Sequence, residues 1–215
     1  LVGQKVKKGE CLAEAQGMVS APVHAPTSGT VLAVADVTAP HPSGLAMPAI
    51  MLEPDGLDEW IELKGCDDPF ALSPAEINKK VAAAGVVGMG GGTFPSAVKL
   101  TGANRAGIHT VIINGGECEP YLSCDDVLMR TQAAGIVAGV RLIVHASGAK
   151  RALIGIEDNK PEAIAAMQAA AAGYDTVRVC PVPARFPMGF DKQMVKTLTG
   201  IEVPADGRSF DAGVL

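Results

Sequence analysis

The feature that most constrains the fold is an alternation of short apolar runs and helical stretches in the second half of the chain. The runs are brief and rich in Val and Ile, which is typical of buried parallel strands. We expect strands near Thr110–Ile113, Ala152–Ile156 and Thr176–Val179. We expect helices near Asp125–Ala146, Pro161–Ala172 and Asp191–Leu198, with Gly148, Gly173 and Gly200 where C-terminal glycines are favoured. Repeated βα units of this length predict a parallel, three-layer (Rossmann-like) α/β domain.

Polar residues follow two of the predicted strands. The stretch from Asn114 to Pro120 comes after the first strand and contains Glu117 and Glu119, and Glu157-Asp-Asn comes after the second. Ligands of parallel α/β sheets bind beyond the carboxyl ends of the strands. We therefore expect these two clusters to converge at one edge of the sheet, and to form one ligand site together with a glycine-rich loop.

A glycine-rich loop precedes the first of these strands. Four of the five residues from Gly88 to Gly92 are glycine, namely Gly88, Gly90, Gly91 and Gly92, so backbone N–H groups can approach a ligand without a Cβ in the way. Ser96 is a plausible N-cap of the next helix, and Lys99 adds a positive charge one turn later. Phosphate is the ligand that this combination favours. The glycine run by itself is also compatible with a plain turn.

Two common phosphate-binding motifs are excluded by spacing and context. A P-loop requires Gly-Lys-Ser/Thr at the point where Thr93 and Phe94 follow Gly88. A Rossmann fingerprint follows a strand, whereas this loop follows a helix expected from the Ser73-Pro74 capping box to about Ala84.

Residues 1–65 read as a small all-β domain, and a linker over residues 63–72 connects it to a second domain, residues 66–215. The segments Val6–Leu12 and Ala25–Val31 resemble the two halves of a biotinyl/lipoyl-like barrel-sandwich hybrid. Carrier domains of that kind present one lysine on a hairpin tip. Met18 stands at that position, and no lysine occurs between Lys8 and Lys64. A structural or docking role is therefore favoured over a carrier role.

Composition narrows the remaining functions. A net charge of −5, a pI of about 5.4 and 4% aromatic residues argue against a nucleic-acid partner. The five cysteines form no C-x-x-C pair, so no metal site is expected, and their odd number suits a reducing compartment. No apolar run reaches about 18 residues, so we expect no direct membrane span. The chain starts at Leu1 without a leader pattern, and we expect it to be part of a longer polypeptide.

Three motifs together carry a family resemblance: the stretch from Gly88 to Leu100, the stretch from Asn114 to Tyr121, and Asp125-Asp-Val-Leu-Met-Arg130. In this order they resemble RnfC, the NADH-oxidising subunit of the Rnf ion-translocating electron transport complex. More distantly they resemble the flavin-binding 51 kDa subunit of respiratory complex I. The resemblance covers nearly the whole chain but only the front part of the full subunit. Gly92 stands where such proteins usually have alanine, a change that should only loosen the loop.

The resemblance implies FMN as cofactor and NADH as substrate. The FMN phosphate would be held by Gly88, Gly90, Gly91, Gly92 and Lys99, and the hydroxyls and ring edge by Asn114, Glu117, Glu157 and Asp158. Phe94 would pack beside the nicotinamide, and Glu119 would hydrogen-bond it. No residue is assigned as a catalytic acid, base or nucleophile. Without the resemblance, solvated surface positions would explain Glu117, Glu119 and Lys99 as well.

The implied function is electron entry: NADH passes electrons to FMN, and they continue to two [4Fe-4S] clusters that lie outside this chain. The implied partners are the other subunits of the Rnf membrane complex, which would hold the protein peripherally at the cytoplasmic face of the bacterial inner membrane. The alternative is a non-catalytic scaffold or docking module of a membrane redox complex. We expect the isolated chain to fold, to contain no iron, to bind FMN weakly or not at all, and to be inactive, because the family's next strand and loop complete the flavin site.

Overall fold

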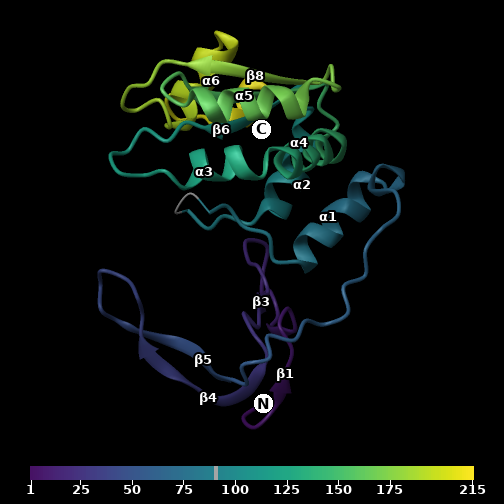
Figure 1. The fold of residues 1–215 in the computed structure, drawn as a ribbon, viewed down its shortest axis with the longest axis vertical. Coiled ribbons are helices and arrows are strands. Elements are labelled where there is room, and N and C mark those ends of the chain that lie inside the picture. The colour runs from purple at the N-terminus through teal and green to yellow at the C-terminus, as the bar shows by residue number, and fades with distance from the viewer. Residues whose placement is uncertain (90–91) are drawn as a thin grey trace. The chain divides into compact units, whose positions relative to one another are not determined.

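A computed structural model describes residues 1–89 and 92–215 (Figure 1). Residue contacts divide this part of the chain into two compact units. Unit 1 comprises Leu1–Asp67 with Lys80–Ser96, and unit 2 comprises Asp68–Lys79 with Ala97–Leu215. Gly90 and Gly91, two of the predicted phosphate-loop residues, lie outside the described residues.

Unit 1 is built on strands, as the sequence predicted, and these strands pair antiparallel. The strands are β1 (Lys5–Val6), β2 (Cys11–Ala13), β3 (Val23–His24), β4 (Gly29–Thr38) and β5 (Ala46–Pro54). One sheet has the order β1-β4-β5, and β2 pairs with β3 in the other. Figure 1 shows β4 and β5 as a long hairpin. The small core contains Val6, Ala25 and Val31, packed against the partly buried Leu12, Ile50 and Leu52.

The helix predicted after the linker is α1 (Pro74–Ala83). Ser73 and Glu76 exchange the hydrogen bonds of a capping box: the Ser73 N–H donates to Glu76 Oε2 at 2.8 Å, and the Glu76 N–H donates to Ser73 Oγ at 3.4 Å. Gly85 ends the helix with a left-handed φ of 66°, and its N–H donates to the Ala82 carbonyl. The glycine-rich loop therefore starts from a defined helix end.

Unit 2 contains the predicted parallel sheet. Its strands are β6 (Thr110–Gly115), β7 (Arg151–Glu157) and β8 (Val177–Val182), in the order β6-β7-β8. At the other side of β6, Val214 forms a parallel bridge with Thr110, and the Leu215 N–H donates to the Thr110 carbonyl at 3.0 Å. The chain thus returns to the sheet at its last residues.

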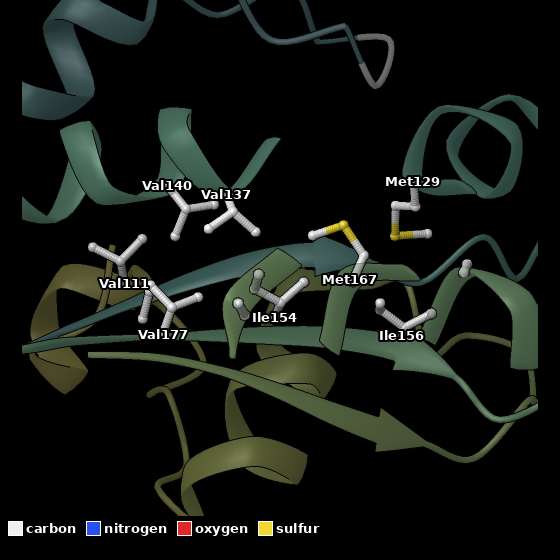
Figure 2. Packing of buried hydrophobic residues seen from close by; sticks show 11 residues of the cluster. Val111, Met129, Val137, Val140, Ile154, Ile156, Met167 and Val177 are labelled. Carbon is white, nitrogen blue, oxygen red and sulfur yellow. The ribbon is translucent and has the colours of Figure 1, made fainter. Parts of the chain in front are cut away.

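Helices cover both faces of this sheet, which confirms the three-layer fold. α3 (Cys124–Thr131), α4 (Ala133–Ser147) and α5 (Pro161–Ala171) pack on one face, and α6 (Asp191–Thr199) packs on the other. The chain also forms α2 (Ser96–Ala106) and the 3-10 turns η1 (Pro69–Ala71) and η2 (Ser209–Ala212). Alternate residues of β6 face opposite layers: Val111 packs in the cluster with α4 and α5, and Ile112 packs in the clusters with α6. Figure 2 shows Val137 and Val140 of α4 above Val111 and Val177 of the sheet.

A stretch predicted to form one helix forms two helices. The stretch expected as a single helix over Asp125–Ala146 breaks at Gln132, and α3 and α4 are bent by 95° relative to each other. Met129 of α3 and Val137 of α4 belong to the same buried cluster, so the bend brings both helices onto one core. No glycine or proline stands at the break, and the sequence pattern therefore did not reveal it.

Three smaller expectations were also wrong. α2 begins at Ser96 itself, so Ser96 is the first helical residue and not the N-cap. β6 continues past Ile113 to include Asn114. Gly148 and Gly200 have the left-handed φ of C-terminal glycines, but Gly173 does not: α5 ends at Ala171, and its C-cap Ala172 is right-handed.

No single helix of the described residues has both the length and the hydropathy that a membrane span requires; α3 and α4 have them only when taken together across their bend. Val137, Val140 and Ala146 of α4 are buried against the rest of unit 2, as in a core helix.

The close packing of β7 on α6 yields the first prediction. A Cβ on Gly155 would lie 2.5 Å from Met194 Sδ and 3.2 Å from Leu198 Cδ1, and Met194 is itself buried. Gly155→Ala should therefore lower the free energy of unfolding by about 1–3 kcal/mol. Gly139→Ala on α4 is the matched control, because a Cβ there meets no atom within 4 Å, and it should raise stability by about 0.5–1 kcal/mol. Urea denaturation measures both; equal effects would contradict the packing described.

Candidate functional site

The carboxyl ends of β6, β7 and β8 surround a pocket of about 400 Å³. The segments that line it follow all three strands, and they contain residues 117–122, residues 157, 159 and 160, and residues 184–186. The sequence predicted that the first two segments converge, and the structure confirms it.

Glu117 is the most heavily hydrogen-bonded side chain at this edge. Its carboxylate accepts from the backbone N–H groups of Asp125 at 3.0 Å and Asp126 at 3.3 Å, at the start of α3. It also accepts from the Cys124 thiol at 3.4 Å and from Lys160 Nζ at 3.3 Å. A carboxylate at a helix N-terminus is favoured by both the free N–H groups and the helix dipole. Glu117 therefore holds α3 in place, and its predicted flavin contact stays a prediction.

These partners decide the protonation state of Glu117. Burial alone raises the pKa of its carboxyl, but the N–H groups of Asp125 and Asp126, the Cys124 thiol and Lys160 outweigh that effect. The pKa lies below its ordinary value, so Glu117 is charged at neutral pH.

Glu157, at the end of β7, has the opposite surroundings. Its side chain is 2% exposed, and its Oε1 atom has no hydrogen-bond partner. Burial raises the pKa of Glu157, Lys160 lowers it, and the nearby charges of Asp158, Glu117 and Glu119 raise it further. Buried polar atoms of folded proteins are nearly always hydrogen-bonded, so a buried carboxylate oxygen without a donor suggests a ligand-binding role.

The loop after β8 completes this edge of the sheet, and the sequence analysis missed it. Asn114 Nδ2 donates to the Gly189 carbonyl at 2.8 Å, and the Ala184 N–H donates to Asp158 Oδ1 at 3.1 Å. The Gly189 N–H lies 3.3 Å from Cys118 Sγ. Asn114 and Asp158 thus position this loop. Ligands of parallel sheets bind beyond the carboxyl ends of the strands, and this rule placed the loops after β6 and β7. Applied to β8 as well, the same rule would have predicted the loop around Gly189.

Glu119 lies at the exposed tip of the loop after β6. Its carboxylate accepts a hydrogen bond from the Cys118 thiol at 3.7 Å. Tyr121, two residues on, is fully exposed and has a left-handed φ of 70°, which is uncommon for a residue other than glycine. Strained backbone of this kind tends to occur at functional loops.

The glycine-rich loop of unit 1 is closed at its base by backbone pairing. Val87 and Pro95 form an antiparallel bridge, and the Gly88 N–H donates to the Phe94 carbonyl at 2.9 Å. A Cβ on Gly92 would meet no atom within 4 Å, so packing does not require glycine there. Thr93 has a φ of 48°, a strained value for a β-branched residue.

The predicted site residues are divided between the two units. Gly88, Gly92 and Phe94 belong to unit 1, and Lys99, exposed on α2, belongs to unit 2 together with the carboxylate pocket. That the glycine loop and the carboxylates form one site therefore remains a prediction.

Three side chains that could ligate a metal ion lie close together, which was not expected from the sequence. The ligand atoms of Glu117, Cys124 and Asp125 all lie within 4.8 Å of one another, a spacing at which they could hold a metal ion. Lys160 already neutralises Glu117, and the backbone of α3 and the Cys124 thiol supply its remaining donors, so we assign no metal there.

Comparison with known proteins agrees with this geometry. Residues 81–215 match the family model of the Nuo51 FMN-binding domain, and residues 1–57 match that of the RnfC barrel-sandwich hybrid domain. The second half of the chain is thus a flavin-binding-type domain of the 51 kDa class, preceded by a barrel-sandwich hybrid domain. The chain belongs to the RnfC family, as its motifs indicated.

Curated relatives include two proteins that are named as a subunit of an ion-translocating oxidoreductase complex. That of Pseudomonas aeruginosa is 48% identical over 100% of this chain and 28% of its own length, and that of Rhodobacter capsulatus is 49% identical over 98% and 41%. The chain therefore spans less than half of the length of these relatives. Among solved structures, an NAD⁺-reducing [NiFe]-hydrogenase in its H₂-reduced state aligns with a TM-score of 0.54 and 26% identity, over 61% of this chain and 25% of the hydrogenase chain.

The two buried glutamates yield the second prediction: their amide variants should change stability in opposite directions at pH 7. Glu117→Gln removes the charge that pairs with Lys160 and the N-terminus of α3, and should lower the free energy of unfolding by about 1–3 kcal/mol. Glu157→Gln removes a buried carboxyl whose charged form is disfavoured by burial and whose Oε1 has no partner, and should raise it by about 1 kcal/mol. Denaturant titration of both variants and of the exposed control Glu119→Gln measures the effects.

The pH dependence of the free energy of unfolding distinguishes Glu117 from Glu157 further. The contribution of Glu117 is complete above the ordinary pKa of 4.5 and is lost as the pH falls through its lower folded value. The cost of Glu157 is complete above its raised folded pKa and disappears as the pH falls toward 4.5. Equal destabilisation by both variants at pH 7 would show that Glu157 has an internal partner.

Proposed function

We propose that this chain forms the electron-entry part of a membrane-bound, ion-translocating NAD:ferredoxin oxidoreductase, and that it binds FMN and accepts electrons from NADH. The observation that carries the proposal is the buried, unpartnered carboxylate oxygen of Glu157 at the ligand-binding edge of the sheet. It lies in a region whose sequence matches the Nuo51 FMN-binding domain.

The residues present suit FMN chemically. The ribityl hydroxyls and the ring N–H of FMN are hydrogen-bond donors, and the buried Oε1 of Glu157 is an acceptor without a donor. The pocket beside it also offers the ammonium group of Lys160 and the backbone of two loops. The glycine-rich loop and Lys99 suit a phosphate group, since backbone N–H groups and a cation both favour an anion.

Bound FMN would accept two electrons from NADH as a hydride and release them one at a time. The residues of the chain itself would bind and orient the cofactor and the substrate. Glu157 would accept a hydrogen bond from the cofactor in a site from which burial excludes water. Glu119, exposed at the mouth of the pocket, would hydrogen-bond the nicotinamide of NADH, and Phe94 would pack beside it. Glu117 keeps the loop that carries Glu119 attached to α3.

Electrons would continue to two [4Fe-4S] clusters in regions outside this chain, and the other subunits of the Rnf complex would hold the protein peripherally at the cytoplasmic face of the bacterial inner membrane. The names of the relatives, which are subunits of a complex, support its place in a multi-subunit complex.

One observation favours the alternative, a docking module without catalysis. The β4–β5 hairpin of unit 1 exposes several apolar side chains, among them Val34, Leu45 and Met47. Exposed apolar patches often mark protein interaction sites. The two roles can coexist, and only the absence of bound flavin in the intact protein would leave docking as the sole function.

The third prediction concerns the phosphate. Lys99→Ala should weaken FMN binding without lowering stability, because a charge-assisted contact contributes about 1.5–3 kcal/mol and an exposed helix lysine contributes little to folding. Flavin content of the intact purified protein, measured by absorbance after dialysis, tests it. Lys79→Ala, an exposed lysine on α1, is the control. Equal flavin retention in the two variants would remove Lys99 from the site.

The fourth prediction is that the flavin band of the intact protein bleaches anaerobically when NADH is added. Glu119→Gln should retain FMN but require more NADH for half-maximal bleaching, by about tenfold if one hydrogen bond to a charged group is lost. A parent protein that holds no flavin, or holds flavin that NADH does not reduce, would contradict the proposed function. Loss of flavin in Glu119→Gln would instead assign this residue to FMN.

A further inference from the structure

Unit 1 contains a pocket of about 560 Å³ that residues 19–24 enclose together with Gly85, Val87 and residues 92–95. One wall is the segment of residues 19–24, which leads from the loop after β2 into β3. The other wall contains Phe94 and Pro95. The volume falls within the range of small-molecule sites, about 300–1,000 Å³.

The two walls are held together by a close backbone approach. A Cβ on Gly85 would lie 2.9 Å from the Pro22 carbonyl and 3.2 Å from His24 Cε1, so only glycine fits there. Gly85 also has the left-handed φ that ends α1. The same glycine therefore seats the hairpin against the start of the glycine-rich loop.

The lining of this pocket suits a flat ring. Val19, Pro22, Val23 and Pro95 supply apolar surface, and Phe94 supplies an aromatic ring. His24 adds a ring that can stack or hydrogen-bond. Planar heteroaromatic rings bind between apolar and aromatic side chains with few polar contacts. Gly92, one of the residues predicted to hold phosphate, also lines this pocket.

We propose that residues 19–24 form one wall of the NADH site and receive one of the two planar rings of the dinucleotide. This inference rests on the proposed function and extends it, because it gives the barrel-sandwich hybrid domain a part in substrate binding. The residues directly after Met18, which stands where carrier domains present a lysine, would here form an apolar wall. Val23 and His24 would then be specificity-determining residues that touch the substrate.

Binding of non-redox fragments tests the proposal independently of turnover. The intact, flavin-loaded protein is titrated by calorimetry with ADP-ribose, which carries only the adenine ring, and with nicotinamide mononucleotide, which carries only the nicotinamide ring. Val23→Asp places a charge in the apolar wall at a half-exposed position that folding tolerates, and His24→Ala is the second variant. Met18→Asp is the control, because Met18 is 86% exposed on the same hairpin and does not line the pocket.

We expect both pocket variants to weaken binding of one of the two fragments by about tenfold, which corresponds to about 1.4 kcal/mol, with FMN content unchanged. The fragment whose binding weakens shows which ring, adenine or nicotinamide, binds against residues 19–24. Met18→Asp should bind both fragments within about twofold of the parent, since it alters no lining residue. Unchanged binding of both fragments by Val23→Asp and His24→Ala would overturn the inference while NADH-dependent bleaching still supports the proposed function. Loss of FMN in these variants would also overturn it, because the pocket would then belong to the flavin.

Discussion

The organisation of the carboxylate edge depends on how one buried charge is satisfied. Glu117 is 7% exposed, and a carboxylate so far removed from water is tolerated only where donors replace its hydration. Two N–H groups of α3 and the ammonium of Lys160, just before α5, do so. Since α3 follows β6 and Lys160 follows β7, this single carboxylate joins the loops after two neighbouring strands. Its neighbour Glu157 lacks such donors, and that contrast between two glutamates of one pocket defines the candidate site.

The loop after β8 is held in place by close backbone contact with the loop after β6. A Cβ on Gly189 would lie 2.7 Å from the Gly116 carbonyl, and a Cβ on Gly116 would lie 3.2 Å from Gly189 Cα. Together with the hydrogen bond from Asn114 to Gly189, this approach sets the distance between the loops after β6 and β8. Preformed sites place their polar groups before the ligand arrives, which lowers the entropic cost of binding. The glycines of the second motif thus serve loop packing, and the carboxylates that they position serve the ligand.

The sequence predicted the parts of the fold that depend on local patterns. The three strands and α5 were found because apolar runs, Pro161 and the glycines mark them. The break at Gln132 was missed, because it arises from the packing of α3 and α4 on one core. At the site, the convergence of Glu117 with Glu157 followed from strand topology. The capping role of Glu117 and the loop around Gly189 did not, since both depend on contacts between residues far apart in the chain.

The central claim is that the buried carboxyl of Glu157 has its missing partner in FMN. The most direct measurement is the pH titration of the Glu157 side-chain carbon by NMR in protein labelled with ¹³C at glutamate, before and after FMN is removed. Without FMN, the pKa should lie above the ordinary value of 4.5, as burial requires. With FMN bound, a donor to Oε1 should lower that pKa and shift the resonance, because a hydrogen bond to the carboxylate favours its charged form. An identical titration curve in both states would contradict the account.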